Sequence, residues 1–241
     1  MTDRPILFSG PMIRALLAGT KTQTRRLASD VPSQPGADCH PRNKPKHPAP
    51  YLDSYCSERK TAANPRGMSV NWCWWQVDDR QCLPTFKVKA QPGDRLWVRE
   101  TWQGLSFGDY RPTKSSQCEV RYAATDPCAD LDAEARGYPW RPSIFMPRWA
   151  SRLTLTVTDV RVERLQDISE ADAIAEGIER SDRFPDRFMT PAGDYAVPVV
   201  AYQRLWDSIN GKGAWADNPW IVAYTFTVHR QNIDAMSKEA A

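Results

Sequence analysis

The chain has 241 residues, of which 41% are hydrophobic and 25% charged, and its formal net charge is +3 at neutral pH. This hydrophobic content can bury a substantial core, which predicts a globular protein. The small net charge excludes a general basic excess, so a nucleic-acid surface would need local clustering of Lys and Arg. No run of about 18 apolar residues and no signal-peptide pattern occurs, which predicts a cytoplasmic protein without a membrane partner.

The first predicted elements are a short buried strand at 5–9 and a helix that starts near Pro11. Proline suits the first turn of a helix, apolar residues recur at helical spacing, and Gly19 is a typical stop. The stretch "GTKTQTRR", Gly19 to Arg26, follows directly and is interpreted as a basic, hydroxyl-rich turn or loop.

Residues 29–91 are rich in Pro, Asn, Lys, Asp and Cys and lack sustained periodicity. This composition predicts a long inserted loop region, with its "NWCWW" segment folding back onto the body. The insertion holds most of the potential zinc ligands, namely Cys39, His40, His47, Cys56, Cys73 and Cys82. Their spacings are irregular, so scattered reduced thiols are favoured over a metal site.

The second half predicts several regular elements. Leu96 and Val98 alternate with polar or aromatic neighbours along one strand, and 118–124 is a second candidate. The clearest strand covers 152–165, with a slip at Thr158 and Asp159 that indicates a bulge or tight bend. Helices are predicted from Ser169 to Gly177 and over 199–210, with a loop between them and a final alternating strand at 219–230. This order favours an α+β fold built on a barrel.

Several classes of chemistry are disfavoured by what the sequence lacks. Its three histidines lie in the insertion or near the C-terminus, which argues against a Ser-His-Asp or Cys-His mechanism. Neither a G-x-G-x-x-G pattern nor a Walker lysine loop occurs, so no nucleotide cofactor is expected.

Three interpretations of "GTKTQTRR" remain open from the residues alone. It could be a solvated turn, an anion-binding loop, or half of an active site in which Lys21 activates a threonine or a water. Neighbouring positive charge and partial burial would lower the pKa of Lys21 in the direction that a base requires. A carboxylate partner is then expected, with Glu100 and Glu176 as candidates. Either glutamate could instead be an arginine partner or an exposed side chain.

Four stretches carry a resemblance to a known family: "ILFSGPMIRALLAGTKTQTRR", "PGDRLWVRETW", "FMPRWASRLTLTVTDVRVERLQDISEADAIAEGI" and "YQRLWDSINGKGAWADNPWIVAYTF". Together they resemble ASCH-domain proteins, in particular the larger phage and bacterial members. The resemblance implies a PUA-like β-barrel with short flanking helices and long loop insertions. It also implies a single domain over 1–241, with insertions at about 29–90, 125–142 and 180–197.

Small members of that family hydrolyse N4-acetylcytidine with a lysine, a threonine and a glutamate, which fall here on Lys21, Thr24 and Glu176. The resemblance thus implies an amidohydrolase acting on the exocyclic amide of N4-acylated cytosine nucleosides, with no metal or cofactor. Lys21 would be the general base, Thr24 the nucleophile or water-positioning hydroxyl, and Glu176 the proton relay. Further candidates for the substrate site are Arg25, Arg26, Glu100, Trp97, Trp102 and Trp149.

An alternative from another class is a non-catalytic module that binds RNA or a modified nucleotide through the same basic loop. A phage accessory protein whose loops bind another protein is a third possibility. The resemblance does not discriminate among preferred acyl groups, and it leaves the oligomeric state open.

Overall fold

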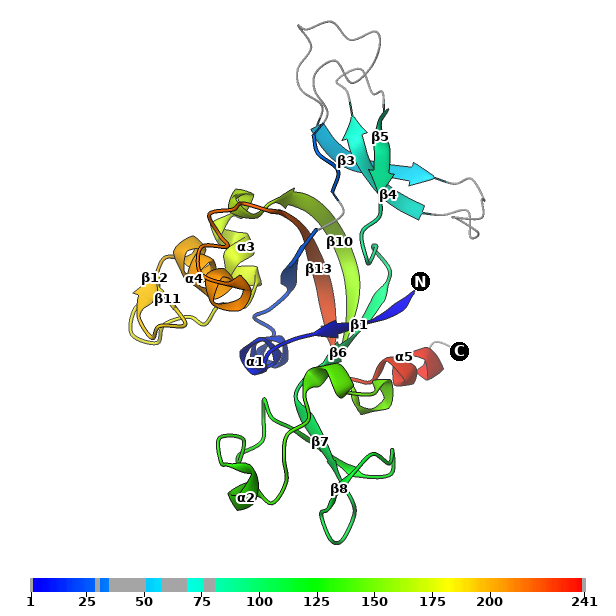
Figure 1. The fold of residues 1–241 in the computed structure, drawn as a ribbon, viewed down its shortest axis with the longest axis vertical. Coiled ribbons are helices and arrows are strands. Elements are labelled where there is room, and N and C mark those ends of the chain that lie inside the picture. The colour runs from blue at the N-terminus through cyan, green and yellow to red at the C-terminus, as the bar shows by residue number, and fades with distance from the viewer. Residues whose placement is uncertain (1, 29–30, 35–50, 58–68, 76–80, 240–241) are drawn as a thin grey trace, which may run out of the picture.

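The chain adopts a mixed α+β fold, described by a computed structural model for residues 2–28, 31–34, 51–57, 69–75 and 81–239 (Figure 1). Within these residues the strands are β1 Asp3–Leu7, β2 Gln23–Leu27, β3 Tyr51–Ser57, β4 Ser69–Trp75, β5 Gln81–Phe86, β6 Arg95–Arg99, β7 Trp102–Leu105, β8 Pro112–Thr113, β9 Glu119–Tyr122, β10 Thr154–Arg164, β11 Phe188–Met189, β12 Tyr195–Ala196 and β13 Trp220–His229. The helices are α1 Gly10–Ala18, α2 Ala133–Arg136, α3 Glu170–Ala175, α4 Pro198–Asn210 and α5 Ile233–Glu239. Short 3-10 turns occupy Ser143–Phe145, Arg148–Ala150 and Leu165–Asp167.

A five-stranded sheet in the order β1-β6-β10-β13-β2 forms the centre of the molecule. The pair β1 and β6 is parallel and the other pairs are antiparallel. The predicted irregularity in the long strand is confirmed as a register shift between Val157 and Asp159. No backbone ladder joins the two edge strands in the described part of the chain. Instead, the Arg26 side chain of β2 donates from Nη2 to the Leu7 carbonyl of β1 at 2.6 Å.

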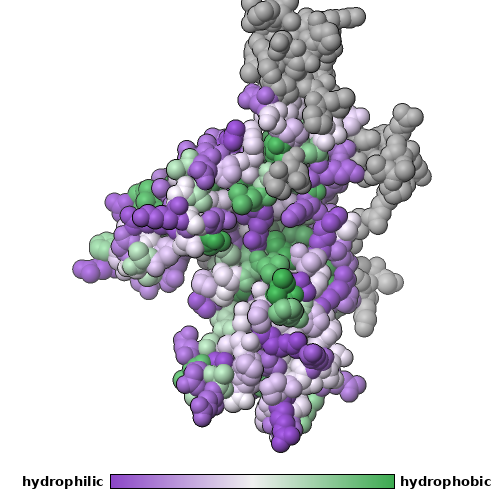
Figure 2. Space-filling model, in the orientation of Figure 1, coloured by the Kyte–Doolittle hydropathy of each residue, from purple (hydrophilic) through white to green (hydrophobic). Residues whose placement is uncertain are grey.

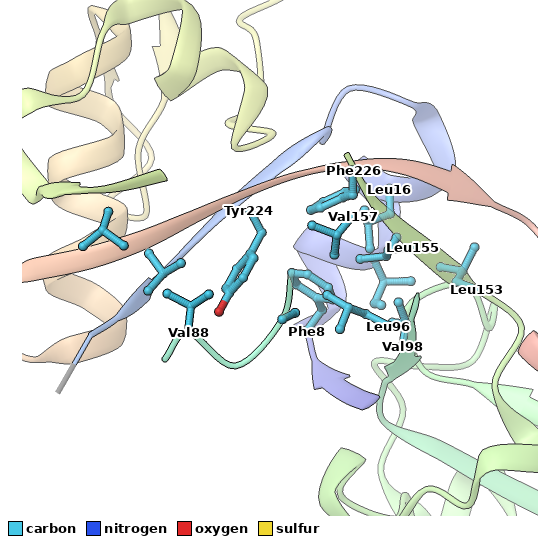
Figure 3. Close-up of a cluster of buried hydrophobic side chains, with 14 of the residues drawn as sticks. Phe8, Leu16, Val88, Leu96, Val98, Leu153, Leu155, Val157, Tyr224 and Phe226 are labelled. Carbon is cyan, nitrogen blue, oxygen red and sulfur yellow. The ribbon is translucent and has the colours of Figure 1, made fainter. Parts of the chain in front are cut away.

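The main core lies between this sheet and α1. Alternate residues of β10 such as Leu155 and Val157 are buried together with Leu96, Val98 and Phe226 from the neighbouring strands (Figure 3). Residues two apart share one face of a strand, so the alternation in the sequence becomes the buried face of the sheet. Helix α1 covers that face with Ile13 and Leu16, and it ends at Gly19 in a left-handed conformation. The predicted helix and its stop are therefore confirmed.

A second layer, made of α3, α4 and the β11–β12 hairpin, lies beside β2 and β13 (Figure 1). Ser169 caps α3, because its side chain accepts from the Asp172 backbone N–H at 3.1 Å. Tyr202 and Trp206 of α4 are buried against Ile221 and Ala223 of β13. Both helices were expected from the sequence. The C-terminal end of α3 lies against β2.

The insertion at 29–90 differs from the expected loop. Strands β3, β4 and β5 pair as an antiparallel sheet of their own, because partners within the insertion supply the hydrogen bonds that periodicity could not reveal. The "NWCWW" segment does fold back onto the body, as expected. Trp72 joins the main core, and Trp74 packs edge-on against Trp220 of β13 with ring centroids 5.5 Å apart.

Three further differences concern element boundaries. The first strand is Asp3–Leu7 rather than 5–9, because Ser9 already precedes α1 as its N-cap residue. The stretch 23–27 is a strand and not a loop, because β13 provides an antiparallel partner for it. A helix, α5, follows the strand that was expected to end the chain. No helix in the described ranges is long and apolar enough to cross a membrane.

Candidate active site

Lys21 and Glu176 meet at the junction of β2 and the end of α3. The Lys21 Nζ lies 2.8 Å from Oε2 of Glu176 and donates to the Glu176 carbonyl oxygen at 2.7 Å. Their backbones also form an isolated antiparallel bridge. Lys21 is fully buried, and the Glu176 carboxylate is nearly so. Residues 155 positions apart in the sequence are thus held together by main-chain and side-chain contacts.

Gly177 allows α3 to approach Lys21 this closely. Its φ is +80°, and a Cβ at this position would lie 2.7 Å from Cβ of Lys21 and 2.9 Å from Cβ of Ala15. Glycine is therefore required both for the left-handed conformation and for space. The sequence identified Gly177 only as a helix stop. In the structure Gly177 also packs directly against Lys21.

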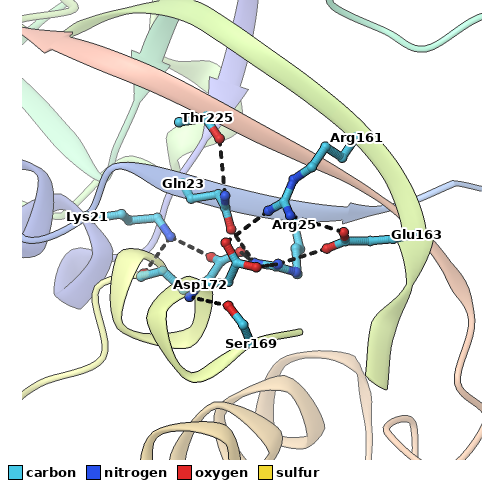
Figure 4. Close-up of polar contacts among 9 residues, drawn as sticks. Lys21, Gln23, Arg25, Arg161, Glu163, Ser169, Asp172 and Thr225 are labelled. Atoms are coloured by element: carbon cyan, nitrogen blue, oxygen red, sulfur yellow. Dashed lines mark hydrogen bonds and ion pairs between the residues drawn. The ribbon is translucent and has the colours of Figure 1, made fainter. Parts of the chain in front are cut away.

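Arg25 of β2 contacts the same carboxylate, and Figure 4 shows Arg25 among its polar neighbours. Its Nη1 lies 3.3 Å from Oε1 of Glu176, while its Nη2 lies 2.9 Å from Glu163 and 3.3 Å from Asp172. The Gln23 Oε1 accepts from Arg25 Nη1 at 2.5 Å. The Arg25 side chain is fully buried, so these contacts fix both the guanidinium and the carboxylates around it.

This environment acts on the titration of Lys21. Burial is the largest influence and lowers the Lys21 pKa, because an ammonium loses its hydration. The Glu176 carboxylate opposes that effect, whereas the positive charges of Arg26 and Arg25 reinforce it. The net result is a Lys21 pKa below its ordinary value of 10.5. The direction matches the expectation from the sequence, although burial contributes more than the neighbouring arginines.

A cavity of about 580 Å³ lies beside this cluster. Its lining combines β1, β2, α4, β13 and the 86–90 segment, so it occupies the space between the two edges of the central sheet. Thr24, Arg25, Arg26 and Glu176 all contribute to the wall, whereas Lys21 lies behind Glu176 and does not. The structure therefore gathers these four predicted site residues around one cavity and places the lysine next to it.

Much of the cavity wall is apolar, with Ile6, Met12, Leu27, Phe86 and Leu205 among its residues. On the face seen in Figure 2, hydrophobic surface gathers over the middle of the molecule and hydrophilic side chains surround it. An apolar wall with a few polar groups is typical of a site for a small organic molecule.

Two tyrosines in the wall, Tyr202 of α4 and Tyr224 of β13, were missed by the sequence analysis. Burial raises the pKa of Tyr202 well above its usual range, and the nearby Glu176 carboxylate adds to the rise. Both hydroxyls therefore stay protonated and can donate hydrogen bonds at neutral pH. The alternation of the final strand could have indicated that Tyr224 shares a face with Val222, but not that this face borders a cavity.

Glu100, the other candidate carboxylate, lies outside the cavity lining. It is buried and forms a bidentate ion pair with Arg152, at 2.9 Å for each of the two N–H···O contacts. Burial raises the pKa of Glu100, and the Arg152 guanidinium partly offsets that rise. Glu100 is therefore an arginine partner in the structure, which is one of the two alternatives that the sequence left open for it.

The candidate stacking tryptophans also lie elsewhere. Trp102 is buried in a small cluster with Met146 and Ala150, and it packs edge-on against Trp149 with ring centroids 5.8 Å apart. Trp97 is covered on one side by the Arg99 guanidinium, 4.9 Å from the ring centroid. None of these three tryptophans lines the cavity, whose aromatic wall residues are Phe86, Tyr202, Trp206 and Tyr224.

No group of three or more His, Cys, Asp or Glu that could hold a metal ion occurs among the residues with described side chains. Of the zinc ligands considered above, only Cys73 falls in that set, and it is a buried free thiol. Comparisons of the chain with protein-family models, with curated proteins and with solved structures found no match.

Proposed function

We propose that this protein is an ASCH-type amidohydrolase with a PUA-like barrel, which removes the acyl group from N4-acylated cytosine nucleosides. The observation that carries the proposal is the contact of Lys21 with Glu176 at the wall of the cavity that Thr24 also lines. These are the three residues that the family resemblance selects. They come from two distant segments, and the sequence resemblance gave no direct information about their spacing in three dimensions.

In the proposed reaction, water adds to the acyl carbon, the C–N bond to the exocyclic nitrogen breaks, and cytidine and a carboxylic acid are released. Glu176 faces the cavity and Lys21 lies behind it, so Glu176 would exchange protons with the substrate and Lys21 would set the charge of the pair. The lowered Lys21 pKa makes the neutral amine more accessible than in water. A proton taken from the attacking group can then return to the leaving nitrogen.

Thr24 is assigned to the attack itself, either as the hydroxyl that positions the water or as a nucleophile whose acyl ester is then hydrolysed by water. Its side chain is buried in the cavity wall on β2. Arg26 lies on the same face of the strand and is assigned to substrate binding through its remaining N–H donors. Arg25 is assigned a positioning role rather than substrate contact, because Glu163, Asp172 and Glu176 already hold its buried guanidinium.

The second candidate function is non-catalytic binding of RNA or of a modified nucleotide. The complete burial of Lys21 favours it, because a lysine held by a carboxylate and a carbonyl also has a purely structural use. In that case Lys21 would join β2 to α3, and the cavity would hold a flipped base without chemistry.

Turnover of N4-acetylcytidine separates the two functions. Purified protein is incubated with the nucleoside, and release of cytidine is followed by chromatography. Thr24→Val is compared with Thr22→Val, a matched control because Thr22 is exposed and lies outside the cavity lining. The amidohydrolase proposal expects turnover by the wild type and by Thr22→Val, and a loss of about a hundredfold or more in Thr24→Val. Equal rates in the two variants would remove Thr24 from the reaction.

A further inference from the structure

The charges in the cavity wall are unbalanced. Among the described residues, five cationic side chains line it, Arg4, Arg25, Arg26, Lys87 and Lys89, and Glu176 is the one carboxylate. Glu176 is already paired with Lys21 and Arg25, so it does not neutralise the remaining cations. A cavity with this balance attracts an anion and repels a cation.

Three of the cations have no anionic partner within the described part of the chain. Arg26 uses one N–H for the Leu7 carbonyl and stacks on the Phe8 ring, and its other donors have no protein partner there. Arg4 and Lys89 are exposed at the cavity, and their side chains form no hydrogen bond or ion pair with described residues. Their donors are therefore available to a ligand.

Two of these cations, Arg4 and Arg26, lie near the Tyr224 hydroxyl, and the third, Lys89, lines the same cavity. Burial raises the pKa of Tyr224, whereas the nearby Lys89 and Ala90 backbone and the charges of Arg26 and Arg4 lower it. Figure 3 shows the hydroxyl pointing toward the segment that contains Val88. The cations come from β1, β2 and the 86–90 segment, three elements that also supply apolar residues to the cavity lining.

We propose that Arg4, Arg26 and Lys89 form a seat for a phosphate group, and that the ligand of this cavity is a phosphorylated cytidine rather than the bare nucleoside. Guanidinium and ammonium donors in the wall of one cavity suit the several acceptor oxygens of a phosphate. This inference rests on the proposed function for the identity of the base. The phosphate can belong to a free mononucleotide or to an RNA strand, since both present the same chemistry.

Isothermal titration tests the seat without any turnover. Cytidine, cytidine 5′-monophosphate, cytidine 3′-monophosphate and a short oligocytidylate are titrated into the wild type, Arg4→Gln, Lys89→Gln and the double variant. Lys212→Gln is the matched control, because Lys212 is an exposed lysine outside the cavity lining. Arg26 is left intact because it also joins β2 to β1.

The expected result is that one of the monophosphates, or the oligonucleotide, binds about tenfold to a hundredfold more tightly than cytidine. The double variant should lose most of this gain while its affinity for cytidine stays unchanged. Lys212→Gln should bind every ligand with the affinity of the wild type. A stronger gain for the oligonucleotide assigns the seat to RNA, and a stronger gain for a monophosphate assigns it to a free nucleotide. The proposal would be overturned if no phosphorylated ligand bound, or if affinities with and without phosphate were equal. It would also be overturned if the gain in affinity survived in the double variant.

The outcome is separable from that of the proposed hydrolysis. Tight, variant-sensitive binding of a monophosphate without turnover of any N4-acetylated ligand would keep the phosphate seat and remove the amide chemistry. Turnover of N4-acetylcytidine with no preference for phosphorylated ligands would do the reverse.

Discussion

Gly177 and Lys21 are packed so closely that a methyl group on the glycine would lie 2.7 Å from the lysine Cβ. We therefore expect Gly177→Ala to lower the free energy of unfolding by about 2–4 kcal/mol, from overpacking together with a positive φ. Urea denaturation measures the change. Gly193→Ala is the matched control, since Gly193 has the same φ of +80° and no atom within 4 Å of the added Cβ. It should cost only about 1–2 kcal/mol, and an equal loss in both variants would contradict the close approach.

Arg25 contacts three carboxylates, those of Glu163 on β10, Asp172 in α3 and Glu176 at the C-cap of α3. Arg25→Met would remove the buried cation that they share, while Lys21 remains on Glu176 and Arg161 on the other two. The expected cost is about 1.5–3 kcal/mol, from the lost charge-assisted hydrogen bonds. Thermal or chemical unfolding measures it. In the comparison variant, Arg204→Met, an exposed pair with Asp194 is removed, and the loss should be much smaller because solvent screens this pair. Similar losses in the two variants would show that the buried network is not a stabilising unit.

Lys21 gives the protein a specific pH dependence. Its folded-state pKa is lowered by burial, so between that pKa and about 10.5 the unfolded chain binds more protons than the folded one. Stability contributed through Lys21 should therefore rise with pH across this window. The measurement is the unfolding free energy of the wild type minus that of Lys21→Met, from pH 7 to 10.5, which cancels the titration of the other groups. A difference that falls with rising pH would contradict the lowered pKa.

Glu100 should matter for stability and not for turnover. Its bidentate pair with Arg152 is buried and lies outside the cavity lining. Glu100→Gln is expected to cost about 1–3 kcal/mol and to leave the turnover rate within about threefold of the wild type. Glu119→Gln, which alters a half-exposed pair with Arg121, should cost less than about 1 kcal/mol. A large fall in kcat with unchanged stability would instead place Glu100 in the reaction.

The elements with strong local signals were predictable from the sequence. The alternation of Leu155, Val157 and Val162 indicated the long strand, and Ser169 and Gly19 marked the start of one helix and the end of another. Strand β2 was not predictable in this way. Its sequence, QTRRL, is mostly polar and basic and has no apolar alternation. It forms a strand because β13 pairs with it.

The candidate site shows the same division. The residue types drew attention to Lys21 and left Glu100 and Glu176 as alternatives, and the family resemblance selected Lys21, Thr24 and Glu176. The structure brings the lysine and Glu176 into contact. Two features of the site depend on tertiary structure. Lys21 is buried behind Glu176, and Tyr224 lies in the cavity wall. Neither is encoded by local periodicity, since each arises where distant segments meet. For the same reason the tryptophans were poor candidates, because aromatic residues fill cores as readily as they bind bases.

Side-by-side turnover of N4-acetylcytidine by the wild type and by Lys21→Met is the most direct measurement of the proposed function. Cytidine and acetate are quantified together, and circular dichroism confirms that the variant is folded at the assay temperature. We expect the wild type to release the two products in equal amounts and Lys21→Met to be slower by about a hundredfold or more, because the pair with Glu176 can no longer exchange a proton. A folded wild type without turnover, or a folded variant as active as the wild type, would contradict it.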